Sequence, residues 1–251
     1  MTDEFSLDQF VMSPSDAEKP ELIMLYGPYG GGKTWLGASA SELDDLYPML
    51  IIDNEGSTTG TVTGFPKGRI DVLRPKDQWP GNEYKATKKV LKDLMTKEHK
   101  YKTVQIDTLG AVFEWAKKEA AKQGLRGFDV WNFLHEELTA DGGLIDQLKQ
   151  ANFLTILILH EKKEGGEDDT LPVADFQWQG QGKGRLGQFP DIIGYVTRDT
   201  NSAGVSTSTV SLTSTKRNNA KNRFGLPAKV VDPSMKKLYD MIETDSSESG
   251  N

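Results

Sequence analysis

From residue 27 to residue 34 the chain reads Gly27-Pro28-Tyr29-Gly30-Gly31-Gly32-Lys33-Thr34. The spacing G-x-x-x-x-G-K-T is the pattern of the phosphate-binding P-loop. An apolar run, residues 22–26, precedes the motif, and a helix-compatible run, residues 35–40, follows it. The glycines allow consecutive backbone N–H groups to face a phosphate, and the next helix directs the positive end of its dipole at the same point. We therefore predict that all eight residues bind ATP.

The motif supplies two of the side chains that Mg²⁺-dependent phosphoryl chemistry needs. Lys33 is expected to reach the β- and γ-phosphates, and the Thr34 hydroxyl is expected to ligate Mg²⁺. A carboxylate must complete the metal site, and Asp107 ends the apolar strand candidate 101–106. We predict that Asp107 holds Mg²⁺ through water. The competing interpretation is that Asp107 only caps the helix that follows it.

Length and composition indicate one α/β domain of ordinary size. A chain of 251 residues can bury a stable core without disulfides or structural metals. The absence of cysteine excludes disulfides and thiolate metal sites. No stretch of about 18 apolar residues occurs, so no membrane span is expected. The first twenty residues are acidic and lack a basic leader region, so no secretory signal is expected. A cytoplasmic location is the expectation that fits these features.

The charge distribution excludes a globally basic nucleic-acid binder but leaves room for a local basic patch. The net charge is −7 and the pI is about 5.1. Residues 201–231 nevertheless contain no Asp or Glu and carry five cations, which are Lys216, Arg217, Lys221, Arg223 and Lys229. The alternative interpretation of this region is a solvated basic hairpin without a ligand.

Strand and helix patterns alternate along the middle of the chain. Several strand candidates are near-continuous apolar runs, which is typical of a parallel sheet that is covered on both faces. The strand candidates are residues 21–26, 48–53, 69–73, 101–106 and 153–159. The helix candidates are residues 83–98, 109–122 and 129–150, the last broken near 141–143. The aromatic residues of these helices are interpreted as core; they are Phe113, Trp115, Trp131 and Phe133.

The last third of the chain no longer shows the regular alternation of strand and helix patterns. Residues 161–170 are rich in charge and glycine and are predicted to be a mobile loop. The segments 192–196 and 206–213 are predicted to be antiparallel strands at the sheet edge, and 234–242 a final helix. Residues 1–19 are predicted to be a flexible arm, and 243–251 a disordered acidic tail. The domain is expected to span residues 20–242.

The acidic residues narrow the kind of P-loop protein. Thr108, rather than Glu, follows Asp107, which departs from the AAA+ pattern in which this strand ends in Asp-Glu. ATP hydrolysis needs a group that orients the attacking water. Glu55 leaves the carboxyl end of strand candidate 48–53, where the sites of α/β proteins gather, and is predicted to be that group. Asp53 is the alternative base, and a surface loop carboxylate is the alternative role for Glu55.

These features resemble the RecA superfamily. Its members place the catalytic Glu after the strand that follows the P-loop helix, as in Ile52-Asp53-Asn54-Glu55, and end the metal-binding strand as in Ile106-Asp107-Thr108. The resemblance implies a RecA-like α/β core with a mainly parallel sheet, helices on both faces and antiparallel edge strands near the C-terminus. It also implies that His160, which ends the next core strand, senses the γ-phosphate and leads into a DNA-binding loop.

A further match, Lys221-Asn222-Arg223-Phe224-Gly225, is identical to the KNRFG motif of RadA-type proteins. In that family the basic residues reach the nucleotide of the neighbouring subunit, so Lys221 and Arg223 are expected to act in trans in a homo-oligomer, ring or filament. The chain looks most like small bacteriophage RecA-like ATPases of single-strand annealing and recombination. That resemblance implies single-stranded DNA and a single-strand DNA-binding protein as partners, in the cytoplasm of a bacterial host.

One departure from this family concerns the expected DNA-binding loop. Five acids in residues 161–170 would repel a phosphate backbone. DNA contact is instead predicted at four basic residues, Lys183, Arg185, Lys216 and Arg217. Trp178 or Phe176 is predicted to stack on bases. The glycine-rich run 179–185 either approaches a DNA backbone or is a flexible surface loop.

Two other functions stay open at this point. The first is an ATPase that loads a helicase or acts as a replication motor, against which the missing Asp-Glu pair argues. The second is a monomeric P-loop kinase of a small molecule, in which Lys221 and Arg223 would be lid or substrate residues. All three hypotheses share the ATP and Mg²⁺ site and differ in the partner.

Overall fold

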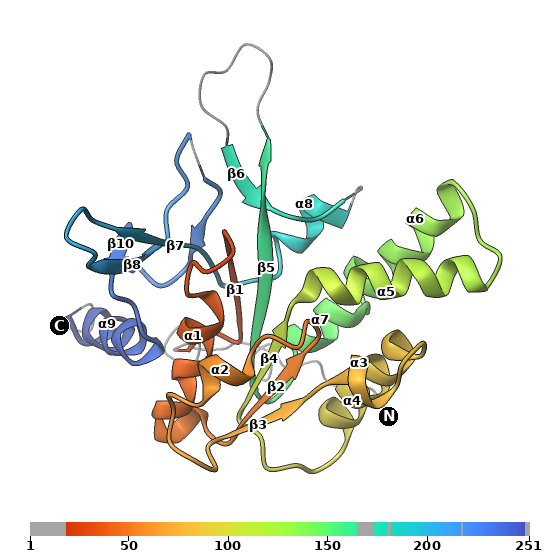
Figure 1. The fold of residues 1–251 in the computed structure, drawn as a ribbon, viewed down its shortest axis with the longest axis horizontal. Helices are drawn as coiled ribbons and strands as arrows, with labels where there is room; N and C mark the ends of the chain where they lie inside the picture. Colours follow the sequence, from red (N-terminus) through yellow and green to blue (C-terminus); the bar gives the residue numbers. More distant parts are fainter. Residues whose placement is uncertain (1–18, 165–172, 180–181, 217, 249–251) are drawn as a thin grey trace, which may run out of the picture.

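The computed structural model of the chain describes residues 19–164, 173–179, 182–216 and 218–248. A central twisted sheet carries helices on both faces (Figure 1). Its strands follow one another in space in the order β10-β8-β7-β1-β5-β4-β2-β3. These strands are, in chain order, β1 Leu22–Gly27, β2 Met49–Asp53, β3 Ile70–Leu73, β4 Thr103–Asp107, β5 Leu154–Glu164, β7 Ile192–Thr200, β8 Ser206–Ser211 and β10 Lys229–Val231. Two further strands branch off, β6 Val173–Phe176 from β5 and β9 Lys221–Asn222 from β7.

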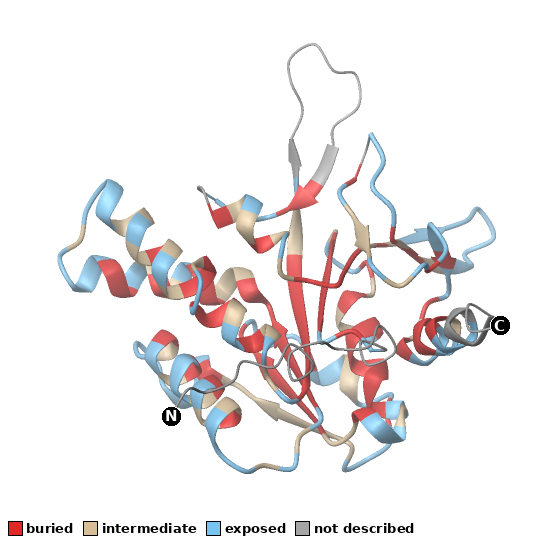
Figure 2. Ribbon diagram, turned by 180° about the vertical axis from the view of Figure 1, so that it is seen from behind, coloured by how far each residue is buried: buried red, intermediate tan, exposed pale blue. Residues whose placement is uncertain are grey.

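In the spatial order β7-β1-β5-β4-β2-β3, neighbouring strands are parallel. Each of the remaining strands, β6, β8, β9 and β10, pairs antiparallel with its neighbour. Every residue of β1, β2 and β4 is buried, as the central strands in Figure 2 show. Successive side chains of a strand point to opposite faces. Leu22, Met24 and Tyr26 accordingly join one core cluster, and Ile23 and Leu25 join the other. The predicted fold class, an α/β core with a mainly parallel sheet, helices on both faces and antiparallel edge strands, is confirmed.

The helices divide between the two faces. The helices α4, α5, α6 and α7 contribute to the core cluster of Tyr26, whereas α1 and α9 contribute to the cluster of Ile23. The longer helices are α1 Lys33–Ala38, α4 Glu83–Thr96, α5 Leu109–Lys122, α6 Phe128–Leu134, α7 Leu144–Lys149 and α9 Met235–Glu248. The short ones are α2 Thr59–Val62, α3 Pro75–Gln78 and α8 Gly182–Leu186, with 3₁₀ turns at Ser39–Glu42 and Asp44–Leu46 and a π turn at His135–Thr139. The predicted break near residues 141–143 is confirmed.

Three sequence-based expectations differ from the structure. β5 continues through residues 161–164 and pairs with β6, so the predicted loop 161–170 contains strand at its start. β7 was expected to be antiparallel, but it lies parallel to β1 and antiparallel only to β8. α9 extends to Glu248, so residues 243–248 are helical rather than a disordered tail. In the first two cases the partner strand, which local composition does not reveal, decides the conformation.

Two expectations concern the chain ends. Residues 1–18 of the predicted arm and residues 249–251 of the predicted tail lie outside the described residues. α9 is docked by apolar side chains that are buried on the α1 side of the sheet, namely Met235, Leu238, Tyr239 and Ile242. Because a helix that is anchored over its first two turns can propagate, the acidic residues that follow continue it.

Candidate active site

The P-loop connects β1 to α1 at the carboxyl end of the sheet and packs against β7. An ideal Cβ at Gly27 would lie 2.1 Å from the Val196 carbonyl oxygen, and one at Gly31 would lie 2.8 Å from the same oxygen. Gly27 has φ +151° and Gly32 has φ +96°, which are conformations that disfavour side chains. The glycines of the motif therefore satisfy two demands, a special backbone conformation and a close approach to β7.

Lys33 folds its ammonium group back over the loop. Its Nζ donates to the carbonyl oxygens of Gly27, at 2.9 Å, and Pro28, at 2.7 Å. Burial lowers the pKa of Lys33, while the Asp107 and Glu55 carboxylates oppose that shift. The side chain borders a cavity of about 490 Å³. The other residues that line this cavity are Tyr29, Gly30, Gly31, Gly32, Thr34, Trp35, Glu55, Ser57, Thr61, Asp107, His160 and Arg198.

Thr34 and Asp107 meet next to Lys33. The Thr34 hydroxyl donates to Asp107 Oδ2 at 2.7 Å, and the Gln105 amide donates to the same oxygen at 3.1 Å. Burial raises the pKa of Asp107 to about 6, and the charges of Asp53 and Glu55 add to that effect. The interpretation of Asp107 as a helix cap is wrong, because the next residue, Thr108, accepts the bond from the Ala111 amide at the start of α5.

Glu55 faces this cavity from the loop after β2. Its Oε1 accepts hydrogen bonds from the Thr108 hydroxyl at 2.9 Å and from His160 Nε2 at 3.0 Å. The bond from His160 lowers the pKa of the Glu55 carboxyl, partial burial works against it, and the bond from Thr108 lowers it further. Thr108 and His160, which lie 53 and 105 residues from Glu55 in sequence, thus hold its carboxylate in place. Their hydrogen bonds also favour its ionised form.

Asp53, the alternative base, has a different environment. Its side chain is buried and accepts bonds from the backbone amides of residues 55–58 and from the Thr58 hydroxyl at 2.8 Å. Arg74 Nε lies 3.4 Å from Asp53 Oδ2. Both carboxylate oxygens of Asp53 are therefore occupied by the loop that carries Glu55, and the geometry assigns Asp53 to holding that loop.

His160 lies beside Gly27 in the register of β5 and β1. The Tyr29 ring, which is largely exposed, stacks on the His160 ring with centroids 4.1 Å apart and an interplanar angle of 32°. His160 thus touches both the P-loop, through Tyr29, and Glu55, through Nε2. His160, the predicted nucleotide sensor, therefore contacts both groups, although it lies within β5 rather than at its end.

Arg198 is a cavity residue that sequence reasoning missed. It lies near the end of β7, three residues beyond Tyr195, which pairs with Tyr26 of β1. Because β7 runs parallel to β1, its carboxyl end reaches the same edge of the sheet as the P-loop. The sequence predicted an antiparallel strand here, and an antiparallel β7 would place Arg198 at the edge of the sheet opposite the P-loop.

Lys221 and Arg223 lie away from the P-loop of their own chain. Lys221 Nζ donates to the carbonyl oxygens of Gly187 and Gln188, and Arg223 Nη1 donates to Asp191 Oδ1 at 3.0 Å. Asp191 also accepts from the backbone amide of Leu22, at the start of β1, whereas the P-loop leaves the end of β1. Neither cation lines the P-loop cavity.

The residues predicted to contact DNA are scattered and mostly engaged. Lys183 Nζ lies 2.7 Å from Asp175 Oδ2, and Arg185 pairs with Asp141. Lys216 is exposed, and Arg217 lies outside the described residues. Within the glycine-rich run 179–185, Gln179 lies in a loop, residues 182–185 belong to α8, and residues 180–181 lie outside the described residues.

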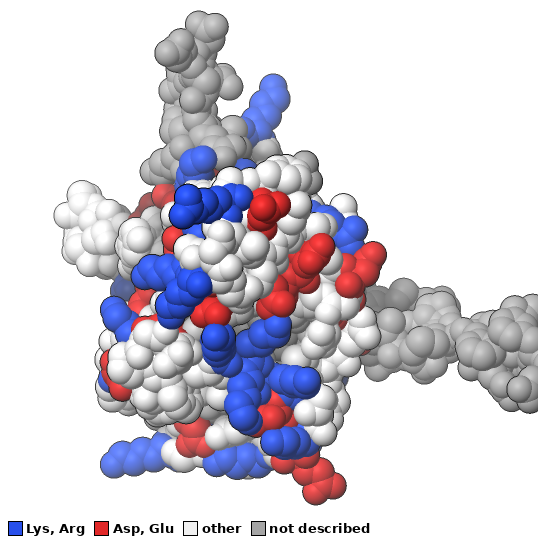
Figure 3. Space-filling view, turned by 90° about the vertical axis from the view of Figure 1, so that its right-hand side faces the viewer, with Lys and Arg blue, Asp and Glu red and all other residues white. Residues whose placement is uncertain are grey.

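Phe176 and Trp178 are not the exposed stacking platforms that the sequence suggested. Phe176 is 6% exposed and packs edge-on against Tyr26, and Trp178 is 4% exposed and packs against Phe113. The prediction is wrong for Phe176, because β6 returns onto β5 and buries it, whereas Trp178, although buried, borders two cavities. Figure 3, which views the side where α5 and α6 end in Figure 1, shows Lys and Arg next to Asp and Glu rather than a surface of one sign.

Comparison with known proteins adds the following. The family model AAA_24, described as an AAA domain, matches residues 19–224. No curated protein sequence matches the chain. Similar solved structures include the RadB recombinase, at 17% identity over 84% of this chain and 85% of that one with a TM-score of 0.47. They also include a prototypical ATPase from the type III secretion system of pathogenic bacteria, at 13% identity over 70% of this chain and 51% of that one, with a TM-score of 0.46. Among the described residues, no helix combines the length and the apolar character that crossing a bilayer requires.

Proposed function

The chain belongs to the AAA domain family, whose model spans residues 19–224, and on that premise we propose that it is a RecA-like, Mg²⁺-dependent ATPase that acts on single-stranded DNA in recombination, annealing or repair. The observation that carries the catalytic part is the convergence of Lys33, the Thr34–Asp107 pair and Glu55 on one cavity. These residues come from three separate elements, and together they are the set that nucleotide hydrolysis needs.

The residues present fit Mg²⁺ and ATP. Thr34 and Asp107 offer a hydroxyl and a carboxylate oxygen 2.7 Å apart, and oxygen is the ligand that Mg²⁺ prefers. Mg²⁺ is usually held by one or two protein groups together with substrate phosphates. Among the described residues no group of three or more His, Asp or Glu forms a cage, which fits that mode. When bound, the metal would polarise the phosphates and offset their charge.

The side chains would divide the catalytic work. Lys33 already donates to two carbonyl oxygens of its own loop, and it can exchange these for phosphate oxygens. Glu55, kept ionised by its hydrogen bonds, would orient the attacking water and accept its proton. His160, joined to Glu55 and stacked under Tyr29, would report the state of the P-loop to the carboxylate. Arg198 would add positive charge from the chain's own β7.

The trans role of Lys221 and Arg223 completes this proposal. Their position away from the P-loop of their own chain is what a subunit-spanning site requires, because each subunit would then lend its cations to a neighbour. Such a head-to-tail contact generates a ring or a filament. Single-stranded DNA, a single-strand DNA-binding protein and a phage origin rest on the sequence resemblance and are part of the proposal.

Two variants test the ATPase assignment. Lys33→Ala and Glu55→Gln should each abolish Mg²⁺-dependent ATPase, both basal and stimulated by single-stranded DNA. The losses should be about 10²–10⁴-fold for the Glu55 variant. Matched controls are Lys92→Ala and Glu98→Gln, which change exposed residues on or just after α4, outside the cavity. Retention of ATPase in both active-site variants would show that this cavity does not hydrolyse ATP.

A further inference from the structure

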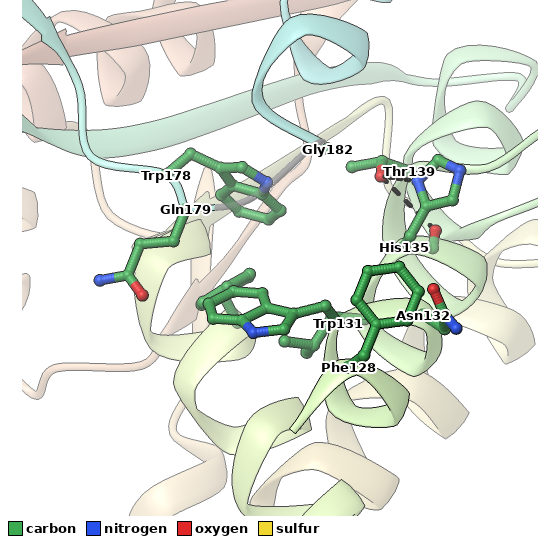
Figure 4. A pocket seen from close by; sticks show the side chains of 10 residues that line it. Phe128, Trp131, Asn132, His135, Thr139, Trp178, Gln179 and Gly182 are labelled. Carbon is green, nitrogen blue, oxygen red and sulfur yellow. Dashed lines mark hydrogen bonds between the residues drawn. The ribbon is translucent and has the colours of Figure 1, made fainter. Parts of the chain in front are cut away.

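A second cavity, of about 180 Å³, lies between α6, the π turn, residues 178–179 and the first residue of α8 (Figure 4). Its lining contains no Asp, Glu, Lys or Arg, and four of the ten residues are Phe or Trp. The lining residues are Phe113, Phe128, Trp131, Asn132, Leu134, His135, Thr139, Trp178, Gln179 and Gly182. We refer to it as the aromatic cavity. It is separate from the P-loop cavity, with which it shares no lining residue.

The aromatic rings form two opposed walls. Trp178 lies on one side of the aromatic cavity, and Trp131 and Phe128 lie on the other (Figure 4). Phe113 joins the two sides, with its ring centroid 4.6 Å from that of Trp178 and 6.4 Å from that of Trp131. Aromatic groups prefer offset or edge contacts with other rings at such distances. A flat ring that enters this space would meet aromatic side chains on both sides (Figure 4).

The mouth of the aromatic cavity is open and partly polar. Phe128, at the start of α6, is 67% exposed, although burying such a ring is favourable. Asn132 and Gln179 are exposed lining residues, and their amides offer hydrogen-bond donors and acceptors at the edge of the cavity (Figure 4). Lys117 Nζ lies 5.7 Å from the centroid of the Trp131 ring. The site thus combines stacking faces, amide edges and a nearby cation.

We propose that the aromatic cavity holds one unstacked base of a single-stranded nucleic acid. A base is flat, uncharged and rimmed with donors and acceptors, and it matches a lining that has aromatic faces, amides and no Asp, Glu, Lys or Arg. An aliphatic side chain of a partner protein offers neither a ring face for the aromatic walls nor edge donors and acceptors for the amides. The lining holds no Lys or Arg to pair with a free anion. This proposal rests on the proposed function, since it names how the same protein would grip the strand.

The aromatic cavity also lies next to the catalytic carboxylate. Phe113, Trp178 and Gln179 also line an adjoining cavity of about 220 Å³, and Glu55 and His160 are among the other residues that line it. A base against Trp178 would therefore press on a residue that borders the Glu55–His160 pair. This contiguity offers a physical reason why strand binding would alter ATP hydrolysis.

The test compares two strands that differ only in their bases. A dye-labelled poly-dT oligonucleotide and an abasic strand of the same length are titrated with the protein, and binding is followed by fluorescence anisotropy. The wild type should bind poly-dT more tightly than the abasic strand. Phe128→Ala should weaken poly-dT binding roughly 5- to 100-fold and leave abasic binding unchanged. Phe128→Trp should keep poly-dT binding, and Phe128→Leu should lose most of it.

The controls separate the possible failures. Trp79→Ala removes a partly exposed ring outside the aromatic cavity and should bind as the wild type does, and thermal unfolding checks that each variant folds. If the wild type binds neither strand, the proposed function fails and this inference fails with it. If the wild type binds both strands equally, or Phe128→Ala matches the wild type on poly-dT, only the base cavity is overturned. A Phe128 variant that changes self-association but not poly-dT affinity would identify a protein contact instead.

Discussion

Two carboxylates that are two residues apart, Asp53 and Glu55, have opposite environments. Asp53 is buried under the amides of its own loop, whereas Glu55 reaches the cavity and is held by two side chains from distant segments. Both oxygens of Asp53 are taken, so it serves the backbone. Glu55 keeps an exposed edge toward the P-loop cavity, so it is the one that can meet a water.

The two carboxylates should respond differently to loss of charge. Asp53→Asn should lower the free energy of unfolding by about 2–4 kcal/mol, because amide donors are then turned toward backbone donors in a buried site. Glu55→Gln should lower it by less than about 1 kcal/mol while it removes the ATPase activity. Urea denaturation of both variants measures the difference. Equal destabilisation of the two would contradict these roles.

Glycine 27 is predicted to be irreplaceable for a steric reason. In Gly27→Ala the new Cβ would meet the Val196 carbonyl oxygen, which lies 2.1 Å from the ideal position. We expect a loss of more than about 2 kcal/mol of unfolding free energy, together with loss of nucleotide binding. Gly30→Ala is the matched control, since it also has positive φ but no heavy atom within 4 Å, and should cost about 1 kcal/mol. Thermal unfolding of both variants decides the point.

At the scale of elements, Asp191 ties together several pieces at the amino end of the sheet. It immediately precedes β7, accepts from the backbone amides of Glu21 and Leu22 at β1, and pairs with Lys149 at the end of α7. It also pairs with Arg223, just after β9. One carboxylate therefore fixes the relative placement of β1, β7, α7 and the KNRFG segment.

The stability that Asp191 provides should depend on pH. Burial raises its pKa, but Lys149 and the two amides outweigh burial and hold the pKa below its ordinary value. A carboxyl with a depressed folded-state pKa stabilises fully above its unfolded pKa of about 3.9, and that contribution is lost as the pH falls through the folded value. Asp191→Asn should thus be destabilised at pH 7, and its deficit relative to wild type should shrink below about pH 4. Denaturation curves across pH 3–7 test this, and a deficit that does not change with pH would refute it.

At the scale of the whole molecule, the P-loop cavity and the KNRFG cations lie at opposite ends of β1. A single subunit cannot bring them together without breaking the contacts of Arg223 with Asp191. A neighbouring subunit can supply these cations to the P-loop from outside. The proposed active unit is therefore an assembly, in which each pocket is completed across an interface.

Mixing two inactive variants tests this arrangement. Lys33→Ala removes the P-loop cation, and Arg223→Ala removes the trans cation. Each alone should lack ATPase activity. In an equal mixture about a quarter of the interfaces should pair an intact P-loop with an intact Arg223, so activity should partly return. Light scattering with ATP and DNA reports assembly in parallel, and circular dichroism confirms that the Arg223 variant folds. Absence of any recovery between folded variants would exclude a trans role.

Much of the site could be predicted because it is encoded in short runs of residues. The P-loop needs eight consecutive residues, and Glu55 and Asp107 follow apolar strands whose carboxyl ends meet at one edge of a parallel sheet. Each of these sequence patterns is local. The P-loop, Glu55 and Asp107 then come together if the strands that precede them are parallel. The near-continuous apolar runs of β1, β2, β4 and β5 in turn predict that the sheet is parallel.

The pairing of strands decided the remaining features. His160 meets Glu55 across 105 residues, Arg198 enters the cavity because β7 runs parallel to β1, and Trp178 is buried because β6 returns onto β5. Periodicity describes which face of one segment is apolar, but it does not say which segment lies beside it. Which strands become neighbours depends on how the whole sheet packs against the helices on its two faces. The surroundings of His160, Arg198 and Trp178 are therefore decided only in the folded chain.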